Sequence, residues 1–184
     1  MNVKGVAFLQ IKDRIIYEFS EEGWNDFFEV FKASYPFFNQ VILAITNIPV
    51  EEFIAFLDVM VKEFYNGDEE VYRILGKLAA KFTLKEGGLF HIYIKRKREP
   101  KDFITKILYR VWSMFYDEGS VKYEVDGNIT HLYILDMPIY HVFFEYVTTG
   151  FAQKALELIG VSIKDVTKVK GSAKETHYKF VLDL

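Results

Sequence analysis

The spacing of the apolar residues changes near residue 120, and this change constrains the fold more than any other feature of the sequence. Before that point, apolar residues recur every three or four positions, which is the period of an amphipathic helix. In the segment 121–126, apolar and charged residues alternate strictly, which is typical of a half-exposed strand. The sequence therefore predicts an α+β fold, with an N-terminal helical lobe followed by an antiparallel sheet.

Residues that commonly begin and end helices divide the first part of the chain. Ser20 and Pro49 each precede two acids, as at a helix start, and Gly119 is a typical helix end. The spacing within Gly5–Phe19 leaves helix and strand open. The other expected helices run from Ser20 to Ser34, from Pro49 to Asn66, from Asp68 to Phe82 and from Pro100 to Gly119.

The C-terminal part is expected to contain four strands and one long helix, in the order strand, strand, helix, strand, strand. The strands are Val121–Val125, Ile129–Leu135, Val161–Lys170 and Glu175–Leu184, with a hairpin turn at Asp126–Asn128 and a helix from Ile139 to Ile159. We expect one domain over residues 1–184, made of a mainly helical lobe, 1–99, and a helix-plus-sheet lobe, 100–184.

Composition excludes several classes of protein. Hydrophobic residues make up 51% of the 184, which is enough for a core and excludes a disordered chain. The net charge of −3 is too small for a protein that mainly binds phosphate backbones. The absence of cysteine removes disulfides, thiolate zinc sites and cysteine nucleophiles. The aromatic content is 17%, and we interpret part of it as the lining of a cavity.

The sequence contains no recognisable catalytic motif. Gly87–Gly88 lacks the remaining residues of a phosphate-binding loop, and no G-x-S-x-G occurs. The four histidines lack the close spacing of a compact metal site, so no metal is expected. His141 lies four residues before Glu145, and we interpret the two as a surface pair rather than as catalytic groups.

Two segments bear on partners and location. The basic run Lys95–Arg98 favours a solvated loop over a nucleic-acid site, because no interleaved aromatic residue accompanies it. The uncharged segment Ala33–Val50 contains helix breakers and is a poor match to a membrane span. With no secretory signal visible, we expect a cytoplasmic protein without a transmembrane segment.

Four stretches resemble an uncharacterised family related to the 4-vinyl reductase domain and, remotely, the heme-nitric-oxide/oxygen-binding (H-NOX) domains. They begin with VKGVAFLQIKDRIIYEFSEEG and VEEFIAFLDVMVKEFYNGDEEVYRILGKLAAKF. FITKILYRVWSMFYDEGSVKYE and MPIYHVFFEYVTTGFAQKALELIGV follow in the same order as in the family. The resemblance implies that the first segment is a helix and that the fold binds or senses a small molecule.

The chain departs from the heme-binding and metal-binding relatives at their characteristic positions. The propionate clamp of those relatives, Tyr-x-Ser-x-Arg, is matched here by Tyr146–Gly150, which lacks both the serine and the arginine. His91 is the candidate for the proximal ligand, but its apolar surroundings resemble a strand. Relatives also carry cysteines in the last hairpin, and this chain has none. We therefore expect no cofactor, with heme and zinc both disfavoured, and no Soret band.

The function expected from these observations is non-enzymatic binding of a small hydrophobic ligand, in a sensory or regulatory domain, between the helical lobe and the sheet. The alternatives are a homo-oligomeric interaction module without a ligand, for example a homodimer, and, disfavoured, a heme-based gas sensor. The expected lining residues of the ligand pocket are Trp112, Phe115, Tyr116, Tyr140, His141 and Phe144.

Overall fold

The computed structural model describes residues 1–84, 88, 91 and 100–183. The chain divides into two compact units. The first contains Met1–Val71 and Met114–Asp117, and the second contains Tyr72–Ser113 and Glu118–Leu184. The first unit thus ends earlier along the chain than the helical lobe expected over 1–99, and the single domain over 1–184 stays a prediction.

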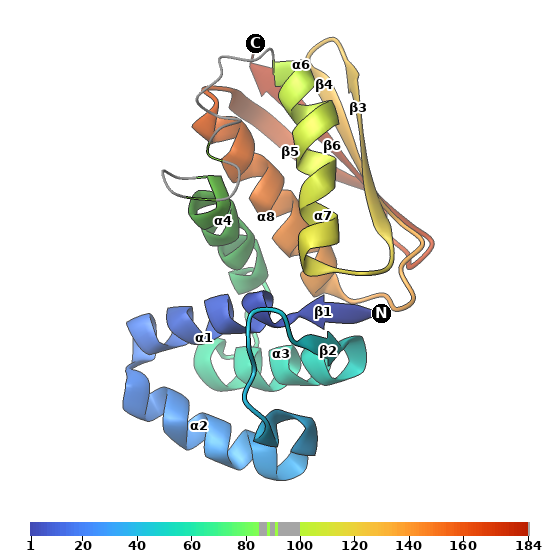
Figure 1. The fold of residues 1–184 in the computed structure, drawn as a ribbon. Coiled ribbons are helices and arrows are strands. Elements are labelled where there is room, and N and C mark those ends of the chain that lie inside the picture. The colour runs from blue at the N-terminus through green and yellow to red at the C-terminus, as the bar shows by residue number, and fades with distance from the viewer. Residues whose placement is uncertain (85–87, 89–90, 92–99, 184) are drawn as a thin grey trace. The chain divides into compact units, whose positions relative to one another are not determined.

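The first unit is helical, with one small sheet. Two short antiparallel strands pair at its edge, with Val3 opposite Ile48. Its elements are β1 (Asn2–Lys4), α1 (Gly5–Phe19), α2 (Glu21–Ser34), a 3₁₀ turn (Pro36–Asn39), β2 (Asn47–Pro49) and α3 (Val50–Tyr65) (Figure 1).

The helix boundaries in this unit follow the capping residues seen in the sequence. The Ser20 hydroxyl accepts a hydrogen bond from the Gly23 backbone N–H at 3.2 Å. Ser20 thus caps α2, which begins at Glu21. Asn66 adopts a left-handed conformation, φ 52°, and ends α3. The first segment is a helix, as the family resemblance implied. The two short strands were missed because three residues are too few for a visible alternation.

Aromatic rings fill the core of the first unit. The Phe56 ring, from α3, is completely buried and its centroid lies 4.9 Å from that of Phe8 in α1. The ring centroids of Phe31 in α2 and Phe38 in the 3₁₀ turn lie 5.7 and 6.0 Å from the centroid of Phe56. Such ring pairs add to the stabilisation that burial alone provides. Part of the high aromatic content is therefore explained by packing.

Replacing the central ring should destabilise the protein strongly. We expect Phe56→Ala to lower the free energy of unfolding by about 3–5 kcal/mol, because it leaves a cavity among packed rings. Tyr17→Ala is the control, since that side chain is 82% exposed, and it should change stability by less than about 0.5 kcal/mol. Urea unfolding followed by circular dichroism measures both. Equal effects of the two substitutions would contradict this account of the core.

The N-terminal strand is held to Asp117 by two hydrogen bonds. The backbone N–H of Asn2 donates to Oδ1 at 2.6 Å, and its side-chain amide donates to Oδ2 at 2.7 Å. The backbone bond first, and the amide bond second, hold the pKa of Asp117 below its ordinary value of 3.8. Both bonds favour the charged carboxylate, so they stabilise the fold only while Asp117 is ionised.

This shift predicts an acid-dependent loss of stability. The unfolded chain binds the proton more readily than the folded chain, so the contribution is present above about pH 4 and is lost as the pH falls through the folded-state pKa. The carboxyl group is exposed, so the effect is small. Urea unfolding between pH 3 and pH 6 should show a steeper decline for the wild type than for Asp117→Asn. Parallel curves for the two proteins would show that these hydrogen bonds do not stabilise the strand.

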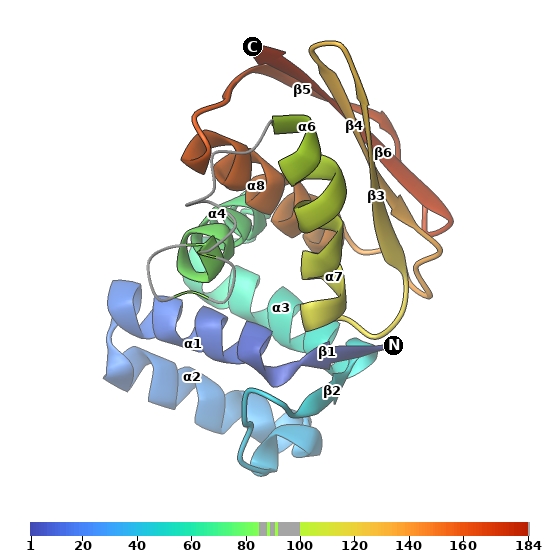
Figure 2. The same cartoon turned by 45° about the horizontal axis from the view of Figure 1, so that its top comes forward.

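The second unit packs helices on one face of a four-stranded antiparallel sheet (Figure 2). The strand order is β3-β4-β6-β5, so β4 and β6 pair directly although α8 separates them in sequence. The elements are α4 (Val71–Leu84), α6 (Pro100–Phe103), a π-helical turn (Ile104–Leu108), α7 (Tyr109–Phe115), β3 (Ser120–Asp126), β4 (Ile129–Leu135), α8 (Val142–Leu158), β5 (Ser162–Lys170) and β6 (Glu175–Asp183).

The predicted α+β fold and the order of elements in this unit are confirmed. The long helix begins at Val142 rather than at Ile139, because His141 caps it. The predicted apolar face of the Asp68–Phe82 helix is only partly buried, since Ile74 and Phe82 are about half exposed. The uncertain apolar run at 90–94 lies outside the described residues apart from His91.

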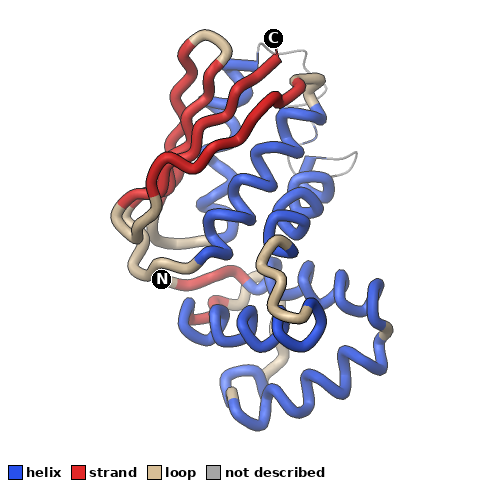
Figure 3. The backbone as a smooth tube through the Cα atoms, turned by 180° about the vertical axis from the view of Figure 1, so that it is seen from behind, coloured by secondary structure: helices blue, strands red, loops and turns tan. Residues whose placement is uncertain are grey.

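Alternation along the strands separates the two faces of the sheet, which Figure 3 shows from behind. In β4, Thr130, Leu132 and Ile134 are buried on the helix side. The intervening residues of β4 and β6 are half-buried and belong to the opposite face. Among the described residues, no helix is long and apolar enough to cross a membrane.

Helices α4 and α8 approach each other closely within the second unit. A Cβ added at Gly76 would overlap the carbonyl oxygen of Val147, and one added at Gly150 would overlap that of Arg73. Glycine at both positions lets the two backbones meet. Arg73 also donates to the Thr149 hydroxyl at 2.9 Å, which fixes the start of α4 against α8.

Candidate functional site

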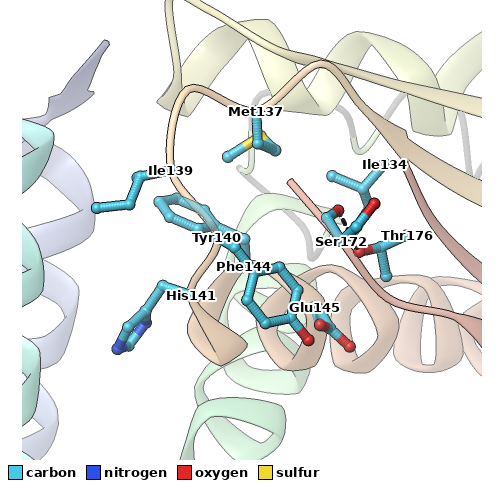
Figure 4. Close-up of a pocket in the computed structure, with 9 residues that line it drawn as sticks. All are labelled: Ile134, Met137, Ile139, Tyr140, His141, Phe144, Glu145, Ser172 and Thr176. Carbon is cyan, nitrogen blue, oxygen red and sulfur yellow. Dashed lines mark hydrogen bonds between the residues drawn. The ribbon is translucent and has the colours of Figure 1, made fainter. Parts of the chain in front are cut away.

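A small pocket lies between the N-terminal end of α8 and the β5–β6 hairpin of the second unit (Figure 4). Its volume is about 10 Å³, which is about the space of one water molecule. Four of the lining residues are wholly apolar, and the other five carry a hydroxyl, imidazole or carboxyl group. The lining consists of Ile134, Met137, Ile139, Tyr140, His141, Phe144, Glu145, Ser172 and Thr176.

The most unusual group in this pocket is the carboxylate of Glu145, which is only 2% exposed. Its Oε2 atom accepts a hydrogen bond from the Tyr178 hydroxyl at 2.7 Å and lies 2.6 Å from the ammonium of Lys168. The Lys168 ammonium also donates to the Tyr140 hydroxyl at 3.1 Å. Side chains from α8, β5, β6 and the loop before α8 thus meet at the carboxylate of Glu145.

Strand register explains how Lys168 reaches this carboxylate. Val166 pairs with Phe180 and Lys168 pairs with Tyr178, and both partners are buried on the helix side of the sheet. Lys168 therefore occupies a position where an apolar side chain is typical. Its ammonium neutralises Glu145, while the Lys168 side chain as a whole remains 41% exposed.

The contacts with Glu145 shift the pKa values of Tyr140, Lys168 and Tyr178. Burial and the hydrogen bond to Glu145 raise the pKa of Tyr178, and the hydrogen bond to Glu145 raises that of Tyr140. Partial desolvation lowers the pKa of Lys168, but hydrogen bonds to Glu145 and Tyr140 together outweigh it and raise the pKa. Lys168 therefore keeps its proton and stays an ammonium ion. It is not available as a neutral, nucleophilic amine.

The second carboxylate oxygen, Glu145 Oε1, is buried without a hydrogen-bond partner in the described part of the chain. A buried oxygen in this state is unfavourable unless a donor reaches it. The adjoining cavity is large enough for one water molecule, which would satisfy this oxygen. The pocket as it stands has no room for a larger hydrophobic ligand.

The interpretation of His141 and Glu145 as a surface pair is wrong. Glu145 is buried and bound to other residues, and the His141 Nδ1 atom accepts a hydrogen bond from the Phe143 backbone N–H at 3.2 Å as the cap of α8. The charged partner of Glu145 is Lys168, which the register of β5 with β6 places on the helix side of the sheet. No spacing within the sequence indicates this pair.

The predicted lining residues fall into both units. Phe115 and Tyr116 belong to the first unit, where both are buried. The other four belong to the second unit, and three of them line the pocket. Trp112 lies outside that lining and donates its indole N–H to the Glu118 carbonyl oxygen at 3.0 Å. A ligand-binding role for these residues stays a prediction.

The positions matched to the propionate clamp lie within α8. Tyr146 packs under the Arg73 guanidinium, whose central carbon is 4.5 Å from the ring centroid. Gly150 contacts the Arg73 backbone, as described for the α4–α8 packing. In the structure these positions therefore serve the contact between two helices.

The described histidines differ in what their ring nitrogens contact. His131 and His177 lie on neighbouring strands and bind each other, with 2.9 Å between Nδ1 and Nε2. His91 Nδ1 lies 3.4 Å from the Leu84 carbonyl oxygen, whereas its Nε2 is buried with no hydrogen-bond partner among the described residues. The sequence showed neither feature, because cross-strand neighbours and burial depend on the tertiary fold.

Comparison with known proteins identifies the fold. No protein-family model matches the chain, and no curated protein matches it in sequence. A mutant H-NOX protein from S. oneidensis in the Fe(II) ligation state superposes with a TM-score of 0.73 at 13% identity, covering 98% of this chain and 96% of that one. An Fe(II) unliganded H-NOX protein from K. algicida superposes with a TM-score of 0.68 at 14% identity, covering 98% of this chain and 97% of that one.

A third similar structure is the S. oneidensis H-NOX protein in the Fe(II)NO ligation state, with a TM-score of 0.70, 13% identity and coverage of 98% and 99%. The remote H-NOX-like relation is therefore supported at the level of the fold. The prediction of no cofactor is contradicted with respect to heme, whereas the part of it that disfavours zinc stays a prediction. Two of these similar structures are described in an iron ligation state, and another similar structure concerns heme distortion in the H-NOX family.

The charged cluster predicts a measurable coupling between two side chains. Lys168→Met leaves the buried Glu145 carboxylate without its counter-ion and should lower the free energy of unfolding by about 2 kcal/mol, less than for a fully buried pair because Lys168 is 41% exposed. Adding Glu145→Gln should restore part of this loss, because the neutral amide needs no counter-ion. Urea unfolding of the two single variants and the double variant measures the coupling.

The matched control is Lys164→Met, on the same strand. Lys164 pairs with Asp183 at 2.8 Å, but both side chains are more than half exposed, so its loss should cost less than about 1 kcal/mol. If the Lys168 and Lys164 variants lose the same stability, or if the Lys168 and Glu145 effects simply add, Lys168 does not act as the counter-ion of the buried carboxylate.

Proposed function

We propose that this chain is a sensory domain that binds a small ligand and that uses heme as its cofactor. The observation that carries the proposal is the superposition on H-NOX proteins in iron ligation states, which extends over 98% of the chain. An accidental likeness of one motif would not extend over both the helical part and the sheet. The proposal does not include catalysis, because no group of catalytic residues is visible in the sequence.

His91 fits the role of an iron ligand by the state of its two ring nitrogens. Metal-bound histidines commonly donate one ring N–H to a backbone carbonyl, which leaves the lone pair of the other nitrogen for the metal. The Leu84 carbonyl lies 3.4 Å from Nδ1, and the buried Nε2 lacks a partner among the described residues. Among the described histidines, only His91 has a buried ring nitrogen without a hydrogen-bond partner.

When bound, heme would supply an iron atom with an open position for a diatomic gas. His91 would then hold the iron through Nε2, and the Leu84 carbonyl would keep the proton on Nδ1. A ligand-contacting role for Tyr140, His141 and Phe144 stays a prediction, since the pocket that they line beside α8 has the space of about one water molecule. A homodimer, the absence of a nucleic-acid partner and a cytoplasmic location remain predictions.

A heme titration tests the proposal. Adding heme to the heme-free protein should produce a Soret band that saturates at one heme per chain. His91→Ala should lose this band, and added imidazole should restore it by occupying the vacated position. His177→Ala is the control and should bind heme as the wild type does. Circular dichroism of each variant checks that it is folded.

Two results would overturn the assignment. A folded wild-type chain that takes up heme only in weak, non-saturating amounts is not a heme domain. A His91→Ala variant with an unchanged Soret band, in the absence of imidazole, shows that His91 is not the ligand.

A further inference from the structure

The face of the sheet opposite α8 carries a cluster of three rings on its two central strands. His131 and Tyr133 come from β4 and His177 comes from β6, and all three side chains are half-buried. Tyr133 pairs with His177 in the strand register, and their rings stack with centroids 4.4 Å apart. This stacking fixes the orientation of the His177 ring.

The two imidazoles are diagonal neighbours across β4 and β6. Their centroids are 5.1 Å apart, and His131 Nδ1 lies 2.9 Å from His177 Nε2. Two nitrogens at about 2.0–2.1 Å from one metal ion are about 2.9 Å apart when they subtend a right angle, and about 3.3 Å apart in a tetrahedral site. The observed separation is that of the hydrogen bond between the two rings, and it also equals the spacing of two adjacent ligands in a square-planar or octahedral site.

From this geometry we infer that His131 and His177 form a binding site for a divalent transition-metal ion, with Cu²⁺ and Ni²⁺ preferred over Zn²⁺. Imidazole ligands suit all three ions, but right-angled ligand pairs belong to the geometries of Cu²⁺ and Ni²⁺. The site is separate from His91 and does not depend on heme.

Binding requires a lone pair on both facing nitrogens. In the neutral pair, one of these nitrogens carries the proton of the hydrogen bond. On metal binding this proton moves to the other nitrogen of the same ring, so each imidazole stays neutral and no net proton is released. Each nitrogen then donates its lone pair to the ion.

Charged groups of both signs lie on this face, and Lys170 pairs in register with His177. Glu124 pairs in register with His131 and accepts a hydrogen bond from the Tyr133 hydroxyl at 3.3 Å. Lys122 forms an ion pair with Glu124 at 2.5 Å, and Lys179 lies opposite His131. In the part of the chain that the structure describes, no group of three or more histidine and acidic residues can hold a metal. Water would therefore complete the coordination, and the site is expected to be weak and open.

Metal titration of the tag-free, heme-free protein tests the inference. Isothermal titration should give one site for Ni²⁺ and a tighter one for Cu²⁺, with weaker binding of Zn²⁺ and none of Mg²⁺. His131→Gln and His177→Gln should each weaken Ni²⁺ binding by at least about tenfold, since removing even a supporting residue commonly costs that much. Paramagnetic broadening of the imidazole NMR signals by Ni²⁺ should be strongest for these two residues.

His141→Asn is the control, because asparagine keeps the helix cap and the residue lies outside the proposed site. Unchanged Ni²⁺ binding in both His131→Gln and His177→Gln would overturn the inference, as would equal binding of Mg²⁺. Loss of Ni²⁺ binding in His91→Ala, with the two sheet variants unaffected, would place the metal elsewhere. Because no heme is present, none of these outcomes depends on the proposed function.

Discussion

The buried carboxylate of Glu145 is the constraint on which the second unit depends. A charge that is 2% exposed is tolerated only with a counter-ion and hydrogen-bond donors, and Lys168 and Tyr178 provide them from two different strands. The start of α8 is thereby tied to β5 and β6 at once. The pocket follows from this arrangement, because the second carboxylate oxygen has no protein donor among the described residues and a water-sized space adjoins it.

The elements were largely predictable because their signals are local. Capping by Ser20, the left-handed Asn66 and the strict alternation in 121–126 each act over a few residues, and each appears in the structure where the sequence placed it. The errors have local causes too. The His141 cap moves the start of α8, and three-residue strands such as β1 are too short to show a period.

The site was less predictable because it depends on register between distant segments. Lys168 reaches Glu145 only because β5 pairs with β6 in one register, and His131 reaches His177 only because β4 pairs with β6. Single-sequence spacing detects neighbours along one helix or strand, but it does not detect these pairs. The exclusion of heme failed for a related reason: it relied on matching the clamp to Tyr146–Gly150, positions that the fold uses to pack α8 against α4.

Native mass spectrometry of the protein produced in heme-supplied cells is the most direct test of the proposed sensory function. The proposal predicts a main species heavier than the chain by one heme, which persists at gentle activation energies because His91 binds the iron. A folded chain that shows only its own mass under these conditions would contradict the proposal.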